Sequence, residues 1–402
     1  MNEKQKPAGR FNILITSDAV PADGEGGAAT AMWETAKRLA KRGHTINVLT
    51  CGAKGLKRKE EIDGIPVWRF GRNIFSSSLY FRQINKEKPV DVLLTHQPFS
   101  ASGLMPWLFR KKIPHVHFFY SPWPEEYLLK CSGKRTPFIT HAAGVLLRRL
   151  MEKIAVSTAD AVVVLSDYIK SKLKELYCPP DSKVRLIPGG IDLKKFNPPH
   201  SQNEKMEIRK GLNLPQDKFL LLTVRNLKSR MGLENLLLAM QKLYSEFPDI
   251  IFLVIGGRGD LETKLKKMAG DLKIEKSVRF TGFIPQEKLP AYYRAADLFV
   301  LPTKSLEGFG LVILESLACG TPVMGTPVGA IPEVLAPLDK RLIFNGTENH
   351  HIYTGIRDFI NRNKNSDPEI IRQTCRGFVE QRYSWEKFTD GVENILYEIK
   401  QV

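Results

Sequence analysis

Two glutamates separated by a glycine-containing run are the first candidates for chemistry in this chain of 402 residues. Glu307 lies in a predicted loop after the predicted strand 298–301, and Glu315 stands about two turns into the following helix, so both side chains return to a similar face. Between them, Gly308 and Gly310 let the backbone approach a ligand and leave N–H groups free at a helix start, which suits a phosphate. Because open α/β sheets bind ligands at this edge, the pattern favours a pocket in which two carboxylates hold the vicinal hydroxyls of a sugar and of a ribose.

Two arginines are the next candidates. Arg225 and Arg230 follow the predicted strand 220–224, and cations beside a strand end can neutralise the charge that grows on a departing nucleoside diphosphate. The alternatives are a role for Lys228, or two solvated arginines that flank a helix start. Since the sequence contains no Asp-x-Asp, we expect arginines and helix N-termini to stabilise the leaving group, and we predict no metal site and no cofactor.

The first half of the chain offers weaker candidates. Gly26 and Gly27 follow the first predicted strand, as in any tight turn between a strand and a helix. His96 ends another predicted strand at the same sheet edge. His117 and Tyr120 stand three residues apart, so an extended strand would direct them to opposite faces. Tyr120 can offer a hydroxyl to a sugar or an acceptor, whereas for either histidine a structural role competes equally with a functional one.

The elements that must position these residues alternate between strand and helix. Short apolar runs predict strands at 11–16, 46–49, 90–94, 116–119, 161–165, 184–187, 220–224, 250–255, 278–281, 298–301 and 322–324. This alternation indicates parallel sheets covered by helices on both faces. The chain is too long for one ordinary core, and the pattern restarts after the proline-rich stretch 198–203, so we predict two α/β domains with a plausible linker at that stretch.

Charge is distributed unevenly between the halves. The net charge is +17, and residues 1–190 hold 30 Lys and Arg against 17 Asp and Glu. Such an excess favours a phosphate-bearing acceptor, an anionic membrane surface or nucleic acid as partner, with a merely solvated basic surface as the alternative. We expect no nucleic-acid binding, because no aromatic residues interleave the basic ones. The dense groups are Lys54/Lys57/Arg58/Lys59, Arg110/Lys111/Lys112, Lys130/Lys134/Arg135 and Arg148/Arg149.

Cysteine usage and hydropathy bear on location. The five cysteines form no Cys-x-x-Cys pair, which argues against a zinc site or a disulfide framework and for a reducing cytoplasm. No apolar run approaches the ~18–20 residues of a membrane span, and the first residues lack the apolar core of a secretory signal. We therefore expect a cytoplasmic protein that can attach peripherally to the inner face of the plasma membrane.

The second half resembles the C-terminal domain of the family 4 retaining glycosyltransferases. The matching motifs are Glu307…Glu315 (the family's E-x7-E), ACGTPV at 318–323, GAIPE at 329–333, FTGFI at 280–284, AAD at 295–297 and IPGGID…F at 187–196. The resemblance is loose over 50–150 and tight over 160–335. It implies the GT-B fold: two Rossmann-like parallel-sheet domains that face a central cleft, with an acceptor-binding domain at 1–190, a donor-binding domain at 191–383 and a last helix, 384–402, that crosses back.

The resemblance also implies roles for the candidates. In the family the first glutamate contacts the donor sugar and the second the ribose, which assigns those roles to Glu307 and Glu315. The remaining donor-binding residues that it implies are Gly26, Gly27, Phe283, Gly308, Phe309, Gly310 and Leu311.

The cation and histidine positions depart from the family pattern. Strict register places Asn226 and Met231 where the family carries arginine and lysine, but a branch of the family carries arginines at the neighbouring positions, as Arg225 and Arg230 do here. Tyr120 stands where many relatives have a histidine that lines the reacting centre.

These observations together predict a retaining, metal-independent hexosyltransferase. It would move a hexose from a UDP- or GDP-sugar to an acceptor hydroxyl on a lipid-linked or polysaccharide acceptor, in glycolipid or cell-surface polysaccharide synthesis. The resemblance further implies that a diphosphate oxygen takes the proton of the acceptor. The alternatives are a degenerate GT-B protein that binds a sugar nucleotide without catalysis, or another GT-B enzyme such as a sugar-nucleotide epimerase. The sequence leaves the sugar, the base and the acceptor open.

Overall fold

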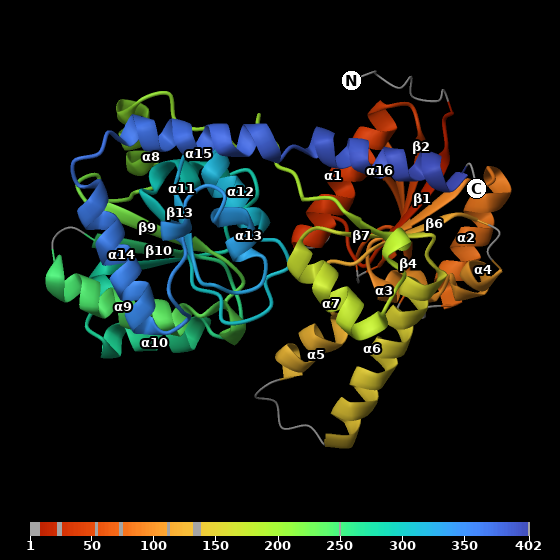
Figure 1. Cartoon of the computed structure of the whole chain (residues 1–402), viewed down its shortest axis with the longest axis horizontal. Coiled ribbons are helices and arrows are strands. Elements are labelled where there is room, and N and C mark those ends of the chain that lie inside the picture. The colour runs from red at the N-terminus through yellow and green to blue at the C-terminus, as the bar shows by residue number, and fades with distance from the viewer. Residues whose placement is uncertain are drawn as a thin grey trace. The chain divides into compact units, whose positions relative to one another are not determined.

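Two compact units make up the chain. The computed structural model in Figure 1 describes residues 9–21, 26–52, 55–71, 75–110, 113–131, 138–248 and 251–400. The first unit comprises Met1–Gly189 together with Trp385–Val402, and the second comprises Gly190–Ser384. Each unit contains one sheet in which helices connect parallel strands, so the predicted fold class of two Rossmann-like α/β domains is confirmed.

The first unit has a sheet with the order β3-β4-β2-β1-β5-β6-β7-β8. Its strands are β1 (Asn12–Ser17), β2 (Thr45–Cys51), β3 (Lys59–Ile62), β4 (Ile65–Phe70), β5 (Val92–Thr95), β6 (His115–Phe118), β7 (Ala161–Val164) and β8 (Val184–Leu186). Its helices are α1 (Gly27–Lys41), α2 (Phe75–Glu87), α3 (Pro98–Ser102), α4 (Met105–Phe109), α5 (Trp123–Cys131), α6 (Phe138–Thr158), α7 (Asp167–Tyr177), the 3₁₀ helix η1 (Asp181–Lys183) and α16 (Trp385–Lys400).

The second unit has a sheet with the order β11-β10-β9-β12-β13. Its strands are β9 (Phe219–Val224), β10 (Ile251–Gly256), β11 (Val278–Gly282), β12 (Leu298–Leu301) and β13 (Val323–Gly325). Its helices are α8 (Gln202–Gly211), α9 (Leu233–Glu246), α10 (Glu262–Asp271), α11 (Leu289–Ala295), α12 (Leu311–Ala318), α13 (Ile331–Leu335), α14 (Asn349–Asn363) and α15 (Pro368–Arg382), with the 3₁₀ helices η2 (Ser229–Met231), η3 (Glu275–Ser277) and η4 (Lys340–Leu342).

The strand order of the second sheet fixes where a ligand can bind. The chain moves outward from β9 to β10 and β11, then returns to the other side of β9 as β12. The loops after β9 and β12 therefore leave the sheet in opposite directions and open a crevice at its carboxyl edge. In the first sheet the same reversal lies between β1 and β5, which pair in parallel register.

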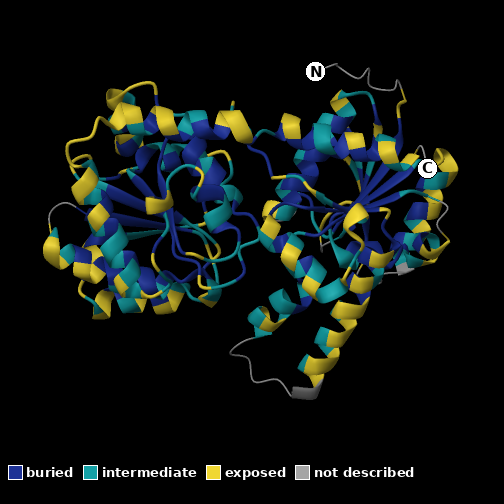
Figure 2. Ribbon diagram, in the orientation of Figure 1, coloured by how far each residue is buried: buried dark blue, intermediate teal, exposed yellow. Residues whose placement is uncertain are grey.

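Buried apolar strands form the core of each unit. All six residues of β1 and of β10 are buried (Figure 2), as expected for parallel strands with helices on both faces. The hairpin of β3 and β4 was not predicted; it pairs antiparallel at the edge of the first sheet. The stretch predicted as a linker was also misjudged. Its Ser201 accepts a hydrogen bond from the Glu204 amide and caps α8 inside the second unit.

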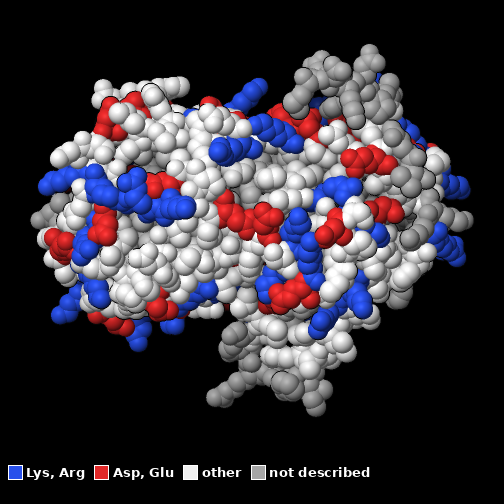
Figure 3. Space-filling view, viewed as in Figure 1, with Lys and Arg blue, Asp and Glu red and all other residues white. Residues whose placement is uncertain are grey.

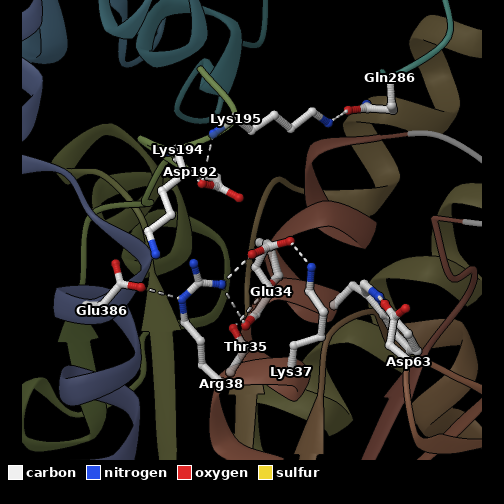
Figure 4. Close-up of polar contacts among 12 residues, drawn as sticks. Glu34, Thr35, Lys37, Arg38, Asp63, Asp192, Lys194, Lys195, Gln286 and Glu386 are labelled. Carbon is white, nitrogen blue, oxygen red and sulfur yellow. Dashed lines mark hydrogen bonds and ion pairs between the residues drawn. The ribbon is translucent and has the colours of Figure 1, made fainter. Parts of the chain in front are cut away.

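The last helix, α16, packs against α1 within the first unit. Glu393 of α16 accepts hydrogen bonds from Arg42 at 2.8 Å and from the His44 ring at 3.1 Å. The Phe11 amide donates to Nδ1 of His44, so the ring donates to Glu393 through Nε2. Figure 4 shows a further contact of this kind, in which Arg38 of α1 donates to Glu386 of α16. His44 thus has a structural role.

Candidate functional site

An ion pair joins the two strands at the switch point of the second sheet. Arg225 directly follows β9, and its Nη2 donates to Oε2 of Glu307, in the loop between β12 and α12, at 2.6 Å. Thr303 accepts a second hydrogen bond from the same guanidinium. The side chains of Arg225 and Glu307 are only 7% and 12% exposed. The structure therefore brings together two predicted catalytic residues that lie 82 positions apart.

The loop that carries Glu307 is held from two sides. Arg230 donates from Nη1 to the carbonyl oxygen of Leu306 at 2.7 Å, and Leu306 itself has a φ of 56°, a left-handed conformation that costs free energy for a residue other than glycine. On the other side, a Cβ on Gly329 would lie 2.2 Å from the carbonyl oxygen of Glu307. Only glycine permits this approach, which explains the first residue of the GAIPE motif.

The Gly308–Leu311 run forms the start of α12. Gly310 adopts a φ of 82° and precedes the first helical residue, and no side chain caps the helix there. The run therefore presents backbone N–H groups and the positive end of the helix dipole beside Arg225 and Glu307, an arrangement that suits an anion. The Phe309 side chain is buried and packs edge-on against Tyr383, so its contribution to a ligand site lies in the backbone.

Glu315 lies on α12 with a tyrosine as partner. The hydroxyl of Tyr293 on α11 donates to Oε2 of Glu315 at 2.7 Å. Burial raises the pKa of Glu315, while the Tyr293 hydrogen bond and the charge of Lys195 act in the opposite direction. Tyr293 fixes one carboxylate oxygen, and sequence reasoning missed it because a tyrosine in an ordinary apolar helix carries no signal of its own.

Phe283 directly follows β11 and is 41% exposed, unusual for a large aromatic side chain beside a sheet edge. The guanidinium carbon of Arg258 lies 5.7 Å from its ring centroid. This flat, accessible ring has the properties of a stacking surface.

In the first unit, one of the two predicted acceptor-side histidines meets Tyr120, which was predicted to be catalytic. Nδ1 of His96 and the hydroxyl of Tyr120 are 2.6 Å apart, beyond the ends of β5 and β6. His117 lies inside β6 and instead contacts Oγ1 of Thr95 at 2.8 Å. The same Thr95 oxygen lies 2.7 Å from Nε2 of His115, a residue that was not predicted.

These rings are uncharged at neutral pH. Burial lowers the pKa of His96 well below its ordinary value and lowers the pKa of His117 to about 4. Burial also raises the pKa of Tyr120, which keeps the phenol protonated. The His96–Tyr120 pair therefore consists of a neutral imidazole and a neutral hydroxyl, which can orient a polar ligand group but does not supply a charge.

An aspartate that sequence reasoning missed lies at the same edge. Asp18 follows β1, its Oδ1 accepts a hydrogen bond from the Ser100 amide at 2.9 Å, and its own amide donates to Gln97 at 2.6 Å. Burial raises the pKa of Asp18 to about 6. Gly26 and Gly27 begin α1 after the same strand, as predicted, with no side-chain cap. The only available signal for Asp18 was an acid directly after an apolar strand.

Within the described residues, no group of three or more His, Cys, Asp or Glu side chains is arranged to hold a metal ion. None of the described helices combines the length and the apolar character that crossing a bilayer requires.

Comparison with known proteins identifies the family. The family described as Glycosyltransferase Family 4 matches residues 25–195, and Glycosyl transferases group 1 matches residues 204–368. The alpha-monoglucosyldiacylglycerol synthase of Streptococcus pneumoniae is 31% identical over 314 residues, which cover 74% of this chain and 67% of that protein. The chain is a family 4 glycosyltransferase. A GDP-mannose-dependent phosphatidylinositol monomannoside mannosyltransferase of Mycolicibacterium smegmatis is 32% identical over half of this chain and 53% of its own length.

Solved structures share the fold of this glycosyltransferase. Sucrose-phosphate synthase of Thermosynechococcus elongatus matches with a TM-score of 0.80 at 22% identity, over 97% of this chain and 99% of that one. HepE of Anabaena, in complex with UDP-glucose, matches with a TM-score of 0.77 at 17% identity, over 97% and 100% of the two chains. The predicted GT-B fold is confirmed.

Proposed function

We propose that this glycosyltransferase transfers a hexose from a UDP- or GDP-sugar to an acceptor hydroxyl, with retention of the anomeric configuration and without a divalent cation. The Arg225–Glu307 pair beside the uncapped start of α12 is the observation that carries the proposal. A cation and the backbone amides at the start of α12 suit the charge of the diphosphate, and a carboxylate at the same switch point suits the sugar hydroxyls.

Each part of the donor has a partner in this arrangement. The diphosphate would bind the amides of Gly308–Leu311, with Arg225 and Arg230 as cations, and Glu307 would accept hydrogen bonds from the sugar hydroxyls. Glu315 would hold the ribose through Oε1, because Tyr293 already occupies Oε2. The exposed ring of Phe283 would support the base.

The residues of this chain would act by positioning and by charge stabilisation. The bond from the anomeric carbon to the diphosphate breaks, and the arginines and the α12 amides stabilise the negative charge that develops on the leaving oxygens. The acceptor hydroxyl attacks on the face that the diphosphate leaves, and a diphosphate oxygen takes its proton. The Tyr120 hydroxyl, fixed by His96, would orient the acceptor or the sugar in place of the family's histidine.

The acceptor that we propose is a lipid-linked one. The names of two relatives contain lipids: one is an alpha-monoglucosyldiacylglycerol synthase, and the other is a phosphatidylinositol monomannoside mannosyltransferase. The mannosyltransferase name specifies GDP-mannose, and HepE was solved with UDP-glucose. Both bases therefore remain within the proposal, as does a polysaccharide acceptor.

Helix α6 supports a membrane-facing role for the first unit. Leu146, Leu147 and Leu150 are 68%, 56% and 53% exposed, and Figure 2 shows exposed residues along α6. Arg149 and Lys153 are exposed on the same helix. On the face shown in Figure 3, the lower part of α5 and α6 is white where it is described, without charged side chains. Leucines flanked by cations suit shallow insertion into an anionic bilayer at the inner face of the plasma membrane.

The basic groups predicted from the sequence contribute unequally to this surface. Arg148 is half-buried: its guanidinium carbon lies 3.7 Å from the ring centroid of Tyr127, and its Nη1 donates to the carbonyl oxygen of Gly144. Arg149 and Lys153 are therefore the more exposed cations of this helix. Five basic residues of the predicted groups lie outside the described residues: Lys54, Lys111, Lys112, Lys134 and Arg135.

Titration calorimetry against UDP, GDP and ADP, followed by transfer assays with the matching hexose conjugates in excess EDTA, tests the donor part. We expect one nucleoside diphosphate to bind most tightly and NMR of the product to show the anomeric configuration of the donor. Binding without hydrolysis or transfer would identify a sugar-nucleotide-binding protein instead, and inversion would contradict the retaining mechanism.

Flotation with vesicles that contain phosphatidylglycerol tests the membrane part. Binding should require the anionic lipid, fall with rising salt and weaken in the Leu146→Asp/Leu150→Asp variant. Leu79→Asp on α2 is the matched control, because Leu79 is 65% exposed in the same unit but lies on another helix. Equal flotation of both variants would show that the membrane contact does not involve Leu146 and Leu150. No flotation at low salt would contradict membrane attachment and favour a soluble acceptor.

A further inference from the structure

A cavity lies in the second unit, away from the Glu307 loop. It has a volume of about 380 Å³, within the range of small-molecule sites. Its walls include Phe219 at the start of β9, Asp297 directly before β12 and Pro322 directly before β13. The cavity is therefore at the amino edge of the sheet, whereas the proposed donor site is at the carboxyl edge.

Most of the wall is apolar. The rings of Phe219, Phe247 and Phe359 line the cavity, together with Ile360 and Ile371 from α14 and α15. Phe359 is 5% exposed, and Phe219 and Phe247 are half-buried. Such a wall favours an aliphatic or aromatic body.

One side of the wall carries an excess of positive charge. Asp297 accepts hydrogen bonds from Lys205 and from Arg209, each at 2.6 Å, so this buried cluster of one carboxylate and two cations has a net charge of +1. Lys205 is 9% exposed and lines the cavity, and burial lowers its pKa. Its ammonium has three donors, of which Asp297 takes one. A buried surplus cation favours an anion in the adjoining space.

Other polar groups in the wall do not remove this excess. Arg294 is paired with Glu204, yet its Nε has no hydrogen-bond partner among the described residues. Arg372 is paired with Glu369, and Lys364 is exposed where it lines the cavity. Asp297 is the one carboxylate among the residues that line it, and it already has two cationic partners.

Glycine at position 320 shapes the same wall. Its φ is 77°, and a Cβ there would lie 2.2 Å from Cγ of Arg372, so only glycine lets the arginine stem pack against this turn. Gly320 belongs to the ACGTPV motif, whose residues at 319–322 all line the cavity. The proposed donor chemistry gives this part of the motif no role.

We propose that this cavity is a second ligand site, for a small molecule with an apolar or aromatic body and one carboxylate or phosphate group. The anionic group would contact the Lys205 ammonium and the free Nε of Arg294, and the body would lie against the three phenylalanines. The cavity is at the amino edge of the sheet and the donor run Gly308–Leu311 at the carboxyl edge, with Glu315 on α12 one turn before Cys319.

Titration calorimetry on the full chain with defined probes tests the site. Phenylbutyrate and phenyl phosphate represent the two anionic groups, and phenylbutanol and inorganic phosphate separate the body from the charge. We expect at least one of the two aromatic anions to bind with a stoichiometry of one, and each of the two partial probes to bind at least about tenfold more weakly, the scale of one charge-assisted hydrogen bond. UDP should not compete.

Two variants locate the binding. Lys205→Met should weaken the bound aromatic anion at least about tenfold, and Ile371→Trp should abolish its binding by filling the cavity. Ile370→Trp is the matched control, because Ile370 is the neighbouring residue on α15, 63% exposed and outside the cavity. Thermal unfolding verifies that each variant is folded. If Lys205→Met does not fold, the comparison of Ile371→Trp with Ile370→Trp decides whether the probe binds in the cavity.

Failure of both aromatic anions to bind, equal binding of phenylbutanol, or competition by UDP would each overturn the proposal. So would unchanged binding in the Ile371→Trp variant. None of these results depends on the donor proposal, because the probes and variants leave Arg225, Glu307 and the α12 amides untouched.

Discussion

Removing the charge of Glu307 should separate binding from turnover. The carboxylate pairs with Arg225 at 2.6 Å. Glu307→Gln keeps an oxygen that can accept from Arg225 but loses the negative charge, and it leaves the α12 amides and Arg230 in place. If Glu307 contacts the donor sugar, the variant should retain affinity for the free nucleoside diphosphate while turnover falls about 10²- to 10³-fold, the cost of one transition-state hydrogen-bonding group.

The same ion pair should also contribute to the free energy of unfolding, measured as a coupling between the two substitutions. Two unit charges about 4 Å apart attract each other by about 4 kcal/mol at an effective dielectric constant near 20. Partial desolvation opposes this attraction, and both side chains retain slight exposure, 7% and 12%. We therefore expect a coupling of about 2–3 kcal/mol between Arg225→Met and Glu307→Gln in a double-mutant cycle.

A matched pair in the same unit is the control. Lys266 and Glu262 on α10 are 2.7 Å apart, nearly the same distance, but are 53% and 31% exposed. Their coupling should not exceed about 0.5 kcal/mol. Urea unfolding of the two cycles measures both energies. For the Arg225→Met single variant, whose remaining carboxylate is buried without its cation, Tm should fall by roughly 5–10 °C.

Two results would refute this reasoning. If the Arg225–Glu307 coupling were no larger than that of the exposed pair, the two side chains would not form the ion pair in solution. If Glu307→Gln lost nucleotide affinity and turnover to the same extent, the carboxylate would act on the nucleotide rather than on the sugar.

Two further predictions follow from the same site, and a third concerns Glu152 on α6 of the first unit. Arg230→Ala should weaken the nucleoside diphosphate by about 10- to 100-fold in calorimetry and the free nucleoside far less; equal losses would move the phosphate role to another residue such as Lys228. Glu315→Ala should weaken the nucleotide about tenfold, whereas unchanged affinity would count against a ribose contact. Burial raises the pKa of Glu152 to about 8 from 4.5. The folded state then keeps a proton that the unfolded state loses, so between pH 4.5 and 8 this group lowers stability by about 1.4 kcal/mol per pH unit. Glu152→Gln should remove that decline, which thermal unfolding at pH 6 and pH 8 measures. An equal change in Tm between the two pH values in both proteins would contradict the raised pKa of Glu152.

The second unit could be predicted closely from sequence because its signals are local. Its strands are unbroken apolar runs, such as the buried Ile251–Gly256, and its motif residues directly follow strands. That rule placed Arg225 and Glu307 at the same sheet edge. It could not predict that the two side chains pair, because the pairing depends on the order of strands in the sheet and not on any local pattern.

The first unit shows where such signals fail. Strand β3 reads KEEI, with exposed and half-buried residues in alternation, and β4 contains Pro66 and Arg69, which interrupt its apolar run. The hairpin is held instead by cross-strand contacts, including an ion pair between Arg69 and Glu60 at 2.5 Å. Charged residues that pair across strands look like loop residues in sequence, because their partner lies on the neighbouring strand.

The position of Asp18, which was missed, follows from the same topological rule that located the predicted residues, His96 among them. Asp18 follows β1 and His96 follows β5, the two strands at the reversal of the first sheet, just as Arg225 and Glu307 follow the strands at the reversal of the second. Backbone groups beyond these strand ends make no hydrogen bonds within the sheet, and polar side chains lie there at both reversals. At the amino edges of the sheets the same rule predicts polar residues with structural roles. Three residues agree with it: His115 contacts Thr95 of the neighbouring strand, and Asp160 and Asp91 accept hydrogen bonds from backbone amides. The Lys205–Asp297–Arg209 cluster departs from this rule through its surplus cation. That departure, more than the volume of the cavity beside it, distinguishes a ligand site from a packing defect.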